Sequence, residues 1–143
     1  MKKIRVLFLC IHNSARSQMG EAYLKFFGGE TYEVESAGLE AGNLNPFAVK
    51  AMLMDGIDIS TNKTNDVNNY HQQGRSYNFV ISVCDEANAA GCPIFPGVNK
   101  KSSWSFPDPS SFSGTDEEKL QFTINVRDKI KEAVKKFIRE TSV

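Results

Sequence analysis

A cysteine and an arginine bound a short polar stretch near the start of the chain. Cys10 follows an apolar run, and Arg16 stands where a segment with helical spacing begins. A loop between a strand and a helix directs backbone N–H groups, and the positive end of the helix dipole, toward one point. That field favours the thiolate form of a cysteine, which is the nucleophilic form. The stretch therefore predicts a cysteine nucleophile aimed at a tetrahedral oxyanion, with Arg16 gripping the anion through two hydrogen bonds.

The loop between these two residues is polar and contains no glycine. Ser14 and Ser17 can donate hydrogen bonds to the thiolate, and His12 and Asn13 tolerate unusual backbone angles. The alternative, a structural cysteine beside a surface arginine, leaves this polar crowding unexplained. The candidate oxyanion ligands are the residues of the whole stretch: Cys10, Ile11, His12, Asn13, Ser14, Ala15, Arg16 and Ser17.

A second candidate group is a carboxyl held between two prolines, in the sequence Pro107-Asp108-Pro109. On a rigid turn, Asp108 is well placed to transfer a proton to a leaving oxygen. An ordinary turn aspartate is an equally good interpretation of Asp108 taken alone. Convergence with Cys10 at one edge of the fold favours the catalytic interpretation.

Two more cysteines, Cys84 and Cys92, bracket a polar segment of small residues. Their spacing is not that of a zinc site, and no second His/Cys pair completes one. If the segment were helical, the two Cα atoms would lie about 12 Å apart, whereas a disulfide needs roughly 4.4–6.8 Å. A Cys84–Cys92 disulfide is therefore a hypothesis that requires the segment to unwind, which Gly91 permits.

Apolar runs and helical spacing alternate along the chain and predict an α/β fold with a parallel sheet. Ser17 is expected to cap the first helix, and Thr115 with Glu118 to form a capping box on the last. Strands are expected at residues 4–9, 32–36, 77–83 and 104–106. Helices are expected over 18–27, from Asn45-Pro46 to Asp55-Gly56 and over 115–139, with 61–69 a loop or a weak helix start.

Ligands of parallel sheets bind beyond the carboxyl ends of the strands. Cys10, Cys84 and Asp108 each follow an expected strand, so all three are expected at that edge. For three other residues we expect structural roles. His71 is expected to be solvated, and Trp104 and Phe106 are expected to belong to the core.

The composition of the chain indicates its number of domains, its class of partner and its location. The chain has 143 residues, 41% of them hydrophobic and 24% charged, which suits one domain over residues 1–143. The formal net charge is +0, so nothing suggests a nucleic-acid or membrane partner. The apolar run at the start is too short for a signal peptide or a membrane span. With free cysteines, this favours a cytoplasmic protein, and we expect a monomer.

Taken together, the run from Cys10 to Met19, the pair Cys84 and Cys92, and Asp108-Pro109 resemble the thioredoxin-coupled arsenate reductases. That family shares the fold of the low-molecular-weight protein tyrosine phosphatases. The resemblance covers essentially the whole chain, in order. It implies four parallel strands with helices on both faces, and a role in arsenic detoxification.

The resemblance also implies a mechanism. Cys10 attacks arsenate held by the phosphate-binding loop and Arg16, and Asp108 protonates the departing hydroxyl. Cys84 then attacks the sulfur of Cys10, arsenite leaves, and Cys92 moves the disulfide to Cys84–Cys92, which thioredoxin reduces. Phosphate and sulfate are the expected competing oxyanions. No cofactor is required, but the family resemblance adds a potassium ion beside the loop, with oxygen ligands from Asn13, Glu21, Ser36 and Asp66.

Two alternatives remain open from the sequence. A low-molecular-weight tyrosine phosphatase needs only Cys10, Arg16 and Asp108, but such enzymes usually carry aromatic residues after Asp-Pro, where this chain has Ser110 and Ser111. Weak phosphatase side activity is expected in either case. An oxyanion-binding or redox-sensing module would keep Cys10 and Arg16 without needing Asp108.

Overall fold

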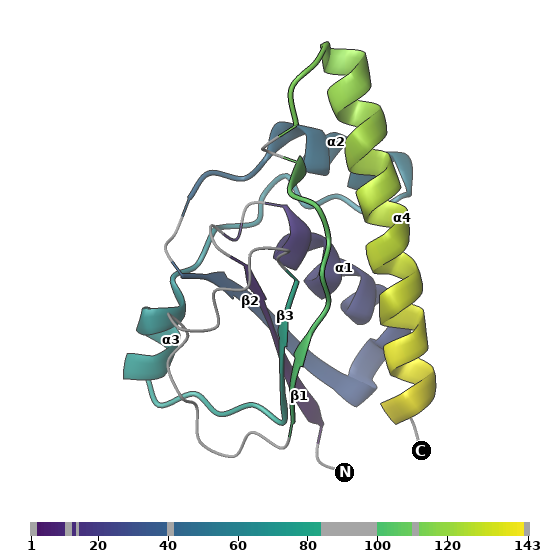
Figure 1. Ribbon diagram of the computed structural model, residues 1–143. Helices are drawn as coiled ribbons and strands as arrows, with labels where there is room; N and C mark the ends of the chain where they lie inside the picture. The colour runs from purple at the N-terminus through teal and green to yellow at the C-terminus, as the bar shows by residue number, and fades with distance from the viewer. Residues whose placement is uncertain are drawn as a thin grey trace.

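The structure is a computed structural model that describes residues 3–10, 13, 15–39, 42–83, 100–109 and 112–141. The strands of these residues form a parallel four-stranded sheet in the order β2-β1-β3-β4 (Figure 1). The predicted fold class is therefore confirmed. In chain order the elements are β1 (Ile4–Cys10), α1 (Arg16–Gly28), the 3-10 turn η1 (Gly29–Thr31), β2 (Tyr32–Gly38), α2 (Pro46–Met54), α3 (Val67–Gln72), β3 (Phe79–Ser82), β4 (Lys100–Ser103) and α4 (Asp116–Thr141).

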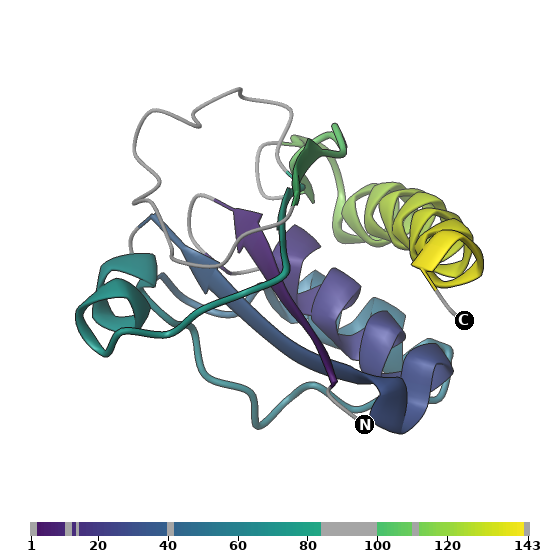
Figure 2. The same cartoon turned by 90° about the horizontal axis from the view of Figure 1, so that it is seen from below.

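Helices cover both faces of the sheet, as expected. Figure 2 shows α1 and α4 on one side and α3 on the other. The alternation of side chains along β1 explains the two layers, because successive residues of a strand point to opposite faces. Val6 and Phe8 belong to the core under α1, α2 and α4, and Leu7 and Leu9 belong to the core that includes Val67 of α3.

Helix α1 packs closely on β1 because Gly20 has no side chain. A Cβ at this position would lie 2.9 Å from Cδ1 of Phe8, which is closer than real contacts allow. The close packing sets the first turn of α1 directly beyond the end of β1. The loop that joins them therefore lies at the carboxyl edge of the sheet.

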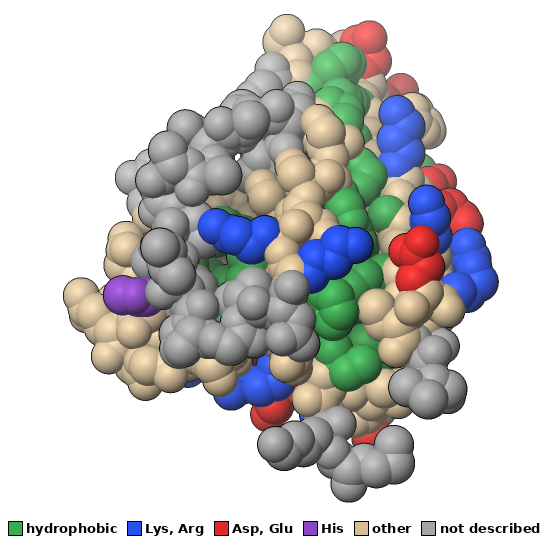
Figure 3. Space-filling model, turned by 60° about the horizontal axis from the view of Figure 1, so that its bottom comes forward, with side chains coloured by type: hydrophobic (Ala, Val, Ile, Leu, Met, Phe, Trp, Pro, Cys, Tyr) green, Lys and Arg blue, Asp and Glu red, His purple; other side chains and the backbone are tan. Residues whose placement is uncertain are grey.

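Helix α4 begins with the predicted capping box. The Glu118 carboxylate accepts a hydrogen bond from the Thr115 backbone N–H, and the Thr115 hydroxyl accepts one from the Glu118 N–H. Its buried stripe packs against α1 and α2. On the face drawn in Figure 3, Lys, Arg, Asp and Glu side chains alternate over α4, as in a solvated helix. In the described parts of the chain, we find no helix with the length and apolar character needed to cross a membrane.

The predicted helix cap and the predicted last strand are wrong. Helix α1 begins at Arg16, one residue before Ser17, so its N-cap residue is Ala15, whose side chain cannot cap; the Ser17 hydroxyl accepts a hydrogen bond from the Asn13 amide. The fourth strand lies at Lys100–Ser103, before the expected residues 104–106. It is a polar edge strand, and its place is set by main-chain pairing with β3 rather than by apolar side chains.

The three residues assigned structural roles lie as expected. His71 is exposed. Phe106 is buried in the core. Trp104 is partly buried, packs against the same core and makes an edge-to-face contact with Phe8. The segment at 61–69 resolves into a coil followed by α3, for which the Asp66 side chain is the N-cap.

Candidate active site

Cys10 is the last residue of β1 and lies at the carboxyl edge of the sheet, as predicted. Its side chain belongs to the core under α1, and the residue is only 3% exposed. The backbone around it is fixed from the β2 side, where the Leu39 N–H donates to the Cys10 carbonyl at 3.0 Å. Cys10 is therefore a buried residue whose backbone is held at the carboxyl end of β1.

Arg16 opens α1 and is almost fully buried, with 2% of its surface exposed. Its Nη1 donates to the Phe106 carbonyl at 3.0 Å, and its Nη2 lies 3.6 Å from Oδ2 of Asp108. The segment after β4 thus supplies both a carbonyl and a carboxylate to the guanidinium. The structure therefore brings Arg16 and Asp108 together at the edge of the sheet where Asp108 was expected.

The charge of Arg16 stands at an unfavourable place in the helix. The positive end of the dipole lies at the first turn of α1, and that turn contains no acidic residue. Burying a cation there is costly unless a negative group offsets it. Asp108 is the acidic partner that the described contacts supply, and a bound oxyanion would be a second.

Asn13 adopts the left-handed conformation that the sequence analysis allowed for it, with a φ of 56°. The residue is fully buried, and its side-chain amide donates to Ser17 Oγ at 2.7 Å and to Ser36 Oγ at 3.0 Å. Left-handed backbone costs free energy in residues other than glycine. These contacts stabilise the left-handed conformation of Asn13.

Two amide residues behind the loop were missed by the sequence analysis. Gln18 donates to both the backbone and the side-chain carbonyl of Asn13, and the Asn65 N–H donates to Asn13 Oδ1 at 2.9 Å. A glutamine in the first helical turn after a polar loop was the available signal for Gln18. Nothing local in the sequence marks Asn65, because its role depends on a long-range contact.

Three of the four residues expected to bind potassium lie in contact with one another. Asn13 donates to Ser36, and the Ser36 hydroxyl donates to Glu21, so three of the four predicted ligands form one chain of contacts. The Asp66 side chain instead accepts from the Asn68 N–H at 2.8 Å. Among the described residues, no cluster of three or more His, Cys, Asp or Glu side chains is arranged for a metal ion.

Several predicted site residues lie outside the described residues: Ile11, His12, Ser14, Cys84 and Cys92. The hypothesis of a Cys84–Cys92 disulfide concerns the same undescribed part of the chain. The described part of the site therefore consists of Cys10, Arg16 and Asp108 with the contacts that hold Asn13.

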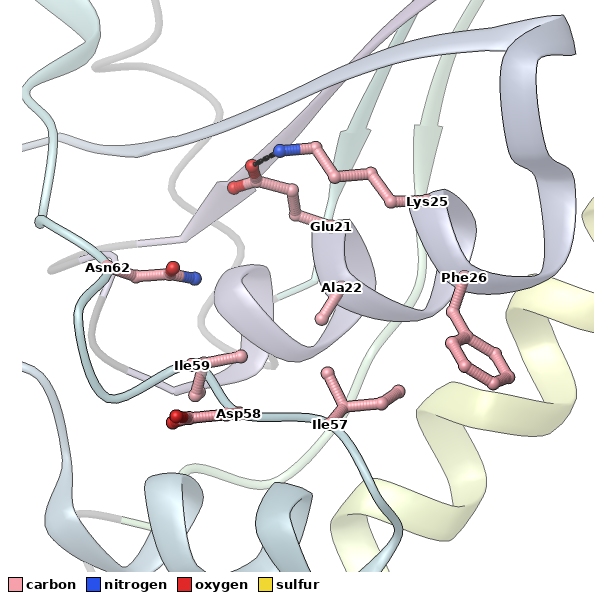
Figure 4. A pocket seen from close by; sticks show the side chains of 8 residues that line it. All are labelled: Glu21, Ala22, Lys25, Phe26, Ile57, Asp58, Ile59 and Asn62. Atoms are coloured by element: carbon pink, nitrogen blue, oxygen red, sulfur yellow. Dashed lines mark hydrogen bonds and ion pairs between the residues drawn. The ribbon is translucent and has the colours of Figure 1, made fainter.

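Surface pockets also lie among the described residues. One, of about 310 Å³, lies between α1 and the segment after α2 (Figure 4). Its walls combine Ala22, Phe26 and Ile59 with the ion pair of Glu21 and Lys25. Another, of about 270 Å³, lies beside the Asp108-Pro109 turn and includes Phe47 and Phe112 among its lining residues.

Comparisons with known proteins agree with this geometry. A model of the family "low molecular weight phosphotyrosine protein phosphatase" matches residues 5–143. The arsenate reductase of Bacillus licheniformis is 45% identical over 139 residues, which make up 96% of this chain and 96% of that protein. The arsenate reductase of Bacillus subtilis is 44% identical over 132 residues, which make up 92% of this chain and 93% of that protein.

A solved structure of an arsenate reductase in the phosphate binding state has the same architecture. It superimposes with a TM-score of 0.80 at 31% sequence identity, over 97% of this chain and 99% of that one. The chain therefore belongs to the low molecular weight phosphotyrosine protein phosphatase family and, within it, resembles the arsenate reductases.

Proposed function

We propose that the protein reduces arsenate to arsenite through a relay of three cysteines and that thioredoxin regenerates it. The observation that carries the proposal is the buried Arg16 at the N-terminus of α1, facing Asp108 and following Cys10. This arrangement offers a nucleophile, an anion-binding group and a proton donor. The arsenate reductases named above, at up to 45% identity, support the choice of arsenate as the substrate.

In the binding step, arsenate occupies the loop of residues 10–17. Backbone N–H groups and the dipole of α1 attract the anion, and Arg16 pairs with two of its oxygens. The anion supplies the negative charge that the buried guanidinium requires. Phosphate and sulfate have the same tetrahedral shape and are therefore expected to compete.

In the first chemical step, the Cys10 thiolate attacks arsenic and forms a sulfur–arsenic bond. An arsenic–oxygen bond breaks, and Asp108 donates the proton with which the oxygen leaves as water. Cys84 then attacks the sulfur of Cys10. The electron pair of the sulfur–arsenic bond stays on arsenic, which leaves as arsenite, and a Cys10–Cys84 disulfide forms.

In the last steps, Cys92 attacks Cys84, frees Cys10 as a thiolate and forms a Cys84–Cys92 disulfide. Thioredoxin returns the two electrons by thiol–disulfide exchange. The two electrons that reduce arsenic thus come from protein thiols, and no bound cofactor takes part. Such a cycle suits a monomer in the reducing cytoplasm.

A potassium ion beside the loop is part of the proposal. Oxygen atoms of Glu21 and Ser36, next to Asn13, are donors that suit a hard cation, and Asp66 follows from the family resemblance. The ion would offset the carboxylate charge behind the loop and help to hold its shape. Thermal denaturation in potassium chloride and in tetramethylammonium chloride tests this, with a higher Tm expected in potassium.

A coupled assay tests the function. Arsenate, thioredoxin, thioredoxin reductase and NADPH are supplied to the wild type and to the variants Cys10→Ser, Cys84→Ser and Cys92→Ser. Arsenate-dependent NADPH oxidation is expected from the wild type alone. Absence of turnover in the wild type, or unchanged turnover in Cys92→Ser, refutes the relay.

Phosphatase activity is the second candidate, because Cys10, Arg16 and Asp108 suffice for it. The pocket beside the Asp108-Pro109 turn includes Phe47 and Phe112, which can accept an aryl group. Hydrolysis of p-nitrophenyl phosphate tests this activity. If arsenate reduction is the main reaction, the phosphatase rate is low, is lost in Cys10→Ser and persists in Cys92→Ser.

A further inference from the structure

Gln18 lies in the first turn of α1 and is only 1% exposed. A buried carboxamide must find partners for its polar atoms. The Nε2 atom lies 3.1 Å from the Asn13 carbonyl oxygen, 3.1 Å from Asn13 Oδ1 and 3.0 Å from the Lys63 carbonyl oxygen. The Oε1 atom accepts a hydrogen bond from Asn62 Nδ2 at 3.1 Å. One side chain therefore ties the loop to a segment far away in the sequence.

The contact to the Asn13 carbonyl has a geometric consequence. A peptide unit is planar, with its carbonyl and its N–H on opposite sides. Fixing the direction of a carbonyl therefore also fixes the direction of the N–H in the same unit. Gln18 holds the carbonyl of Asn13, whose left-handed backbone costs free energy in a residue other than glycine and so depends on outside support.

The segment after α2 reinforces the same residue. The Asn65 N–H donates to Asn13 Oδ1, and the Asn65 amide donates to the Ser36 carbonyl at 3.2 Å. In Figure 4, the Asn62 side chain extends from this segment toward the start of α1. Gln18 thus stands between two surfaces, the loop on one side and residues 62–65 on the other.

We propose that Gln18 is a positioning residue for oxyanion binding: it orients the Asn13 peptide unit so that the loop presents its N–H groups to the anion. Gln18 acts through Asn13 and does not touch the substrate. The inference rests on the oxyanion site of the proposed function. It adds that the affinity of this site depends on a carboxamide outside the anion-binding residues.

The variant Gln18→Met tests the inference, because methionine keeps the length of the side chain and removes both amide hydrogens. We expect sulfate to bind about tenfold more weakly, since a buried carbonyl of the loop loses its donor. Calorimetric titration with sulfate, well below the Tm of each protein, measures this. Asn62→Ala is the matched control, because it removes the partner of Oε1 and leaves the contacts to Asn13; its affinity is expected to stay within about twofold of wild type.

A second variant, Gln18→Glu, shows whether residue 18 acts through its hydrogen bonds to Asn13 or only by filling space. It also provides a test if Gln18→Met does not fold. In Gln18→Glu, a carboxylate faces two oxygens of Asn13 and one of Lys63, whereas its protonated form can donate to one of them. Sulfate keeps its charge between about pH 5 and 8, so the ratio of variant to wild-type Kd is expected to fall as the pH falls. The charged side chains of the surrounding elements, Glu21, Lys63 and Asp66, are present in both proteins, which differ only at residue 18.

The outcomes distinguish this inference from the function on which it rests. Sulfate affinity at the wild-type level in Gln18→Met, or a ratio in Gln18→Glu that stays near one from about pH 5 to 8, overturns the positioning role and leaves the proposed function intact. A wild type that binds no sulfate overturns the inference, and one that also shows no turnover in the coupled assay overturns both. Weaker binding in Gln18→Met together with a ratio above one in Gln18→Glu supports the role.

Discussion

Arg16 and Asp108 face each other across the edge of the sheet, with Arg16 Nη2 3.6 Å from Asp108 Oδ2. One residue opens α1 and the other follows β4, so the pair joins the loop that we propose binds the anion to the turn that we propose donates the proton. An incoming oxyanion needs the same N–H groups that face the carboxylate. We infer that binding draws Arg16 toward the anion and leaves Asp108 next to the oxygen that departs.

Asp108→Asn tests whether the Asp108 carboxylate competes with the oxyanion for the N–H groups of Arg16. The substitution keeps the size of the side chain and removes its negative charge and its acidic proton. Phosphate is expected to bind several-fold more tightly, because one competing charge is gone, while kcat with arsenate falls about 10²-fold or more. Calorimetry with phosphate and the coupled assay measure the two effects. Weaker phosphate binding with an unchanged kcat would mean that Asp108 only holds Arg16 in place.

Arg16→Lys tests the need for a planar, two-pronged donor. Lysine keeps the charge, but it cannot bind two anion oxygens in parallel and also reach the Phe106 carbonyl. We expect kcat/KM for arsenate to fall by about 10²-fold or more and phosphate affinity to fall with it. Arg139→Lys, an exposed change near the end of α4, is the control and should match the wild type. An Arg16→Lys enzyme with nearly normal kcat/KM argues against anion gripping by Arg16.

A cluster remote from the loop should govern stability rather than binding. Asp55, after α2, accepts hydrogen bonds from Tyr23 of α1 at 2.7 Å and from Lys131 of α4 at 2.9 Å. These bonds, that from Tyr23 first, lower the pKa of Asp55, whereas burial and the same carboxylate raise the pKa of Tyr23. The folded-state pKa of Asp55 lies below its unfolded value, so its stabilisation is present above the unfolded pKa and is lost as the pH falls through the folded pKa.

Asp55→Ala is therefore expected to lower the free energy of unfolding by about 1–3 kcal/mol at neutral pH. The difference from wild type should shrink toward zero at acidic pH, where the Asp55 carboxylate is protonated. Urea denaturation across the acidic range measures it, with the exposed Glu140→Gln as the control. A difference that stays constant with pH would show that the ionised carboxylate is not the stabilising group. Phosphate affinity should not change in Asp55→Ala.

The fold was largely predictable because its central strand and its helices carry strong local patterns. β1 is apolar on both faces, and the helices show clear apolar spacing and recognisable ends, such as the Asn45 cap of α2. β4 was misplaced because its residues are Lys-Lys-Ser-Ser. An exposed edge strand needs no apolar face, and its pairing with β3 is not encoded in its own residues.

In the site, too, the features with a local sequence pattern were predicted and those set by long-range contacts were not. The positions of Cys10 and Asp108 followed from the rule that loops after parallel strands meet at one edge. Gln18 and Asn65 were missed: Gln18 has only a weak local signal and Asn65 has none, because both gain their role only when residues 62–65 fold against Asn13. Ser17 was misassigned because α1 begins one residue earlier than expected, at Arg16, so Ser17 lies inside the helix and contacts Asn13.

The cysteine relay predicts a distinct arrest for each variant. Without Cys92, the reaction should stop at a Cys10–Cys84 disulfide after one arsenite is released. Without Cys84, no arsenite should be released, because nothing attacks the sulfur of Cys10. Arsenite released per protein molecule in a single turnover, measured without thioredoxin, distinguishes these cases. Arsenite release by Cys84→Ser at the wild-type level would contradict the assigned order.

The most direct measurement is the disulfide map of the wild type after one equivalent of arsenate, without thioredoxin. The reduced protein is treated with arsenate, its remaining thiols are alkylated, and its peptides are analysed by mass spectrometry. The relay predicts a Cys84–Cys92 disulfide, a free Cys10 and one equivalent of arsenite. Arsenite released with all three cysteines still reduced, or three free thiols and no arsenite, would contradict it.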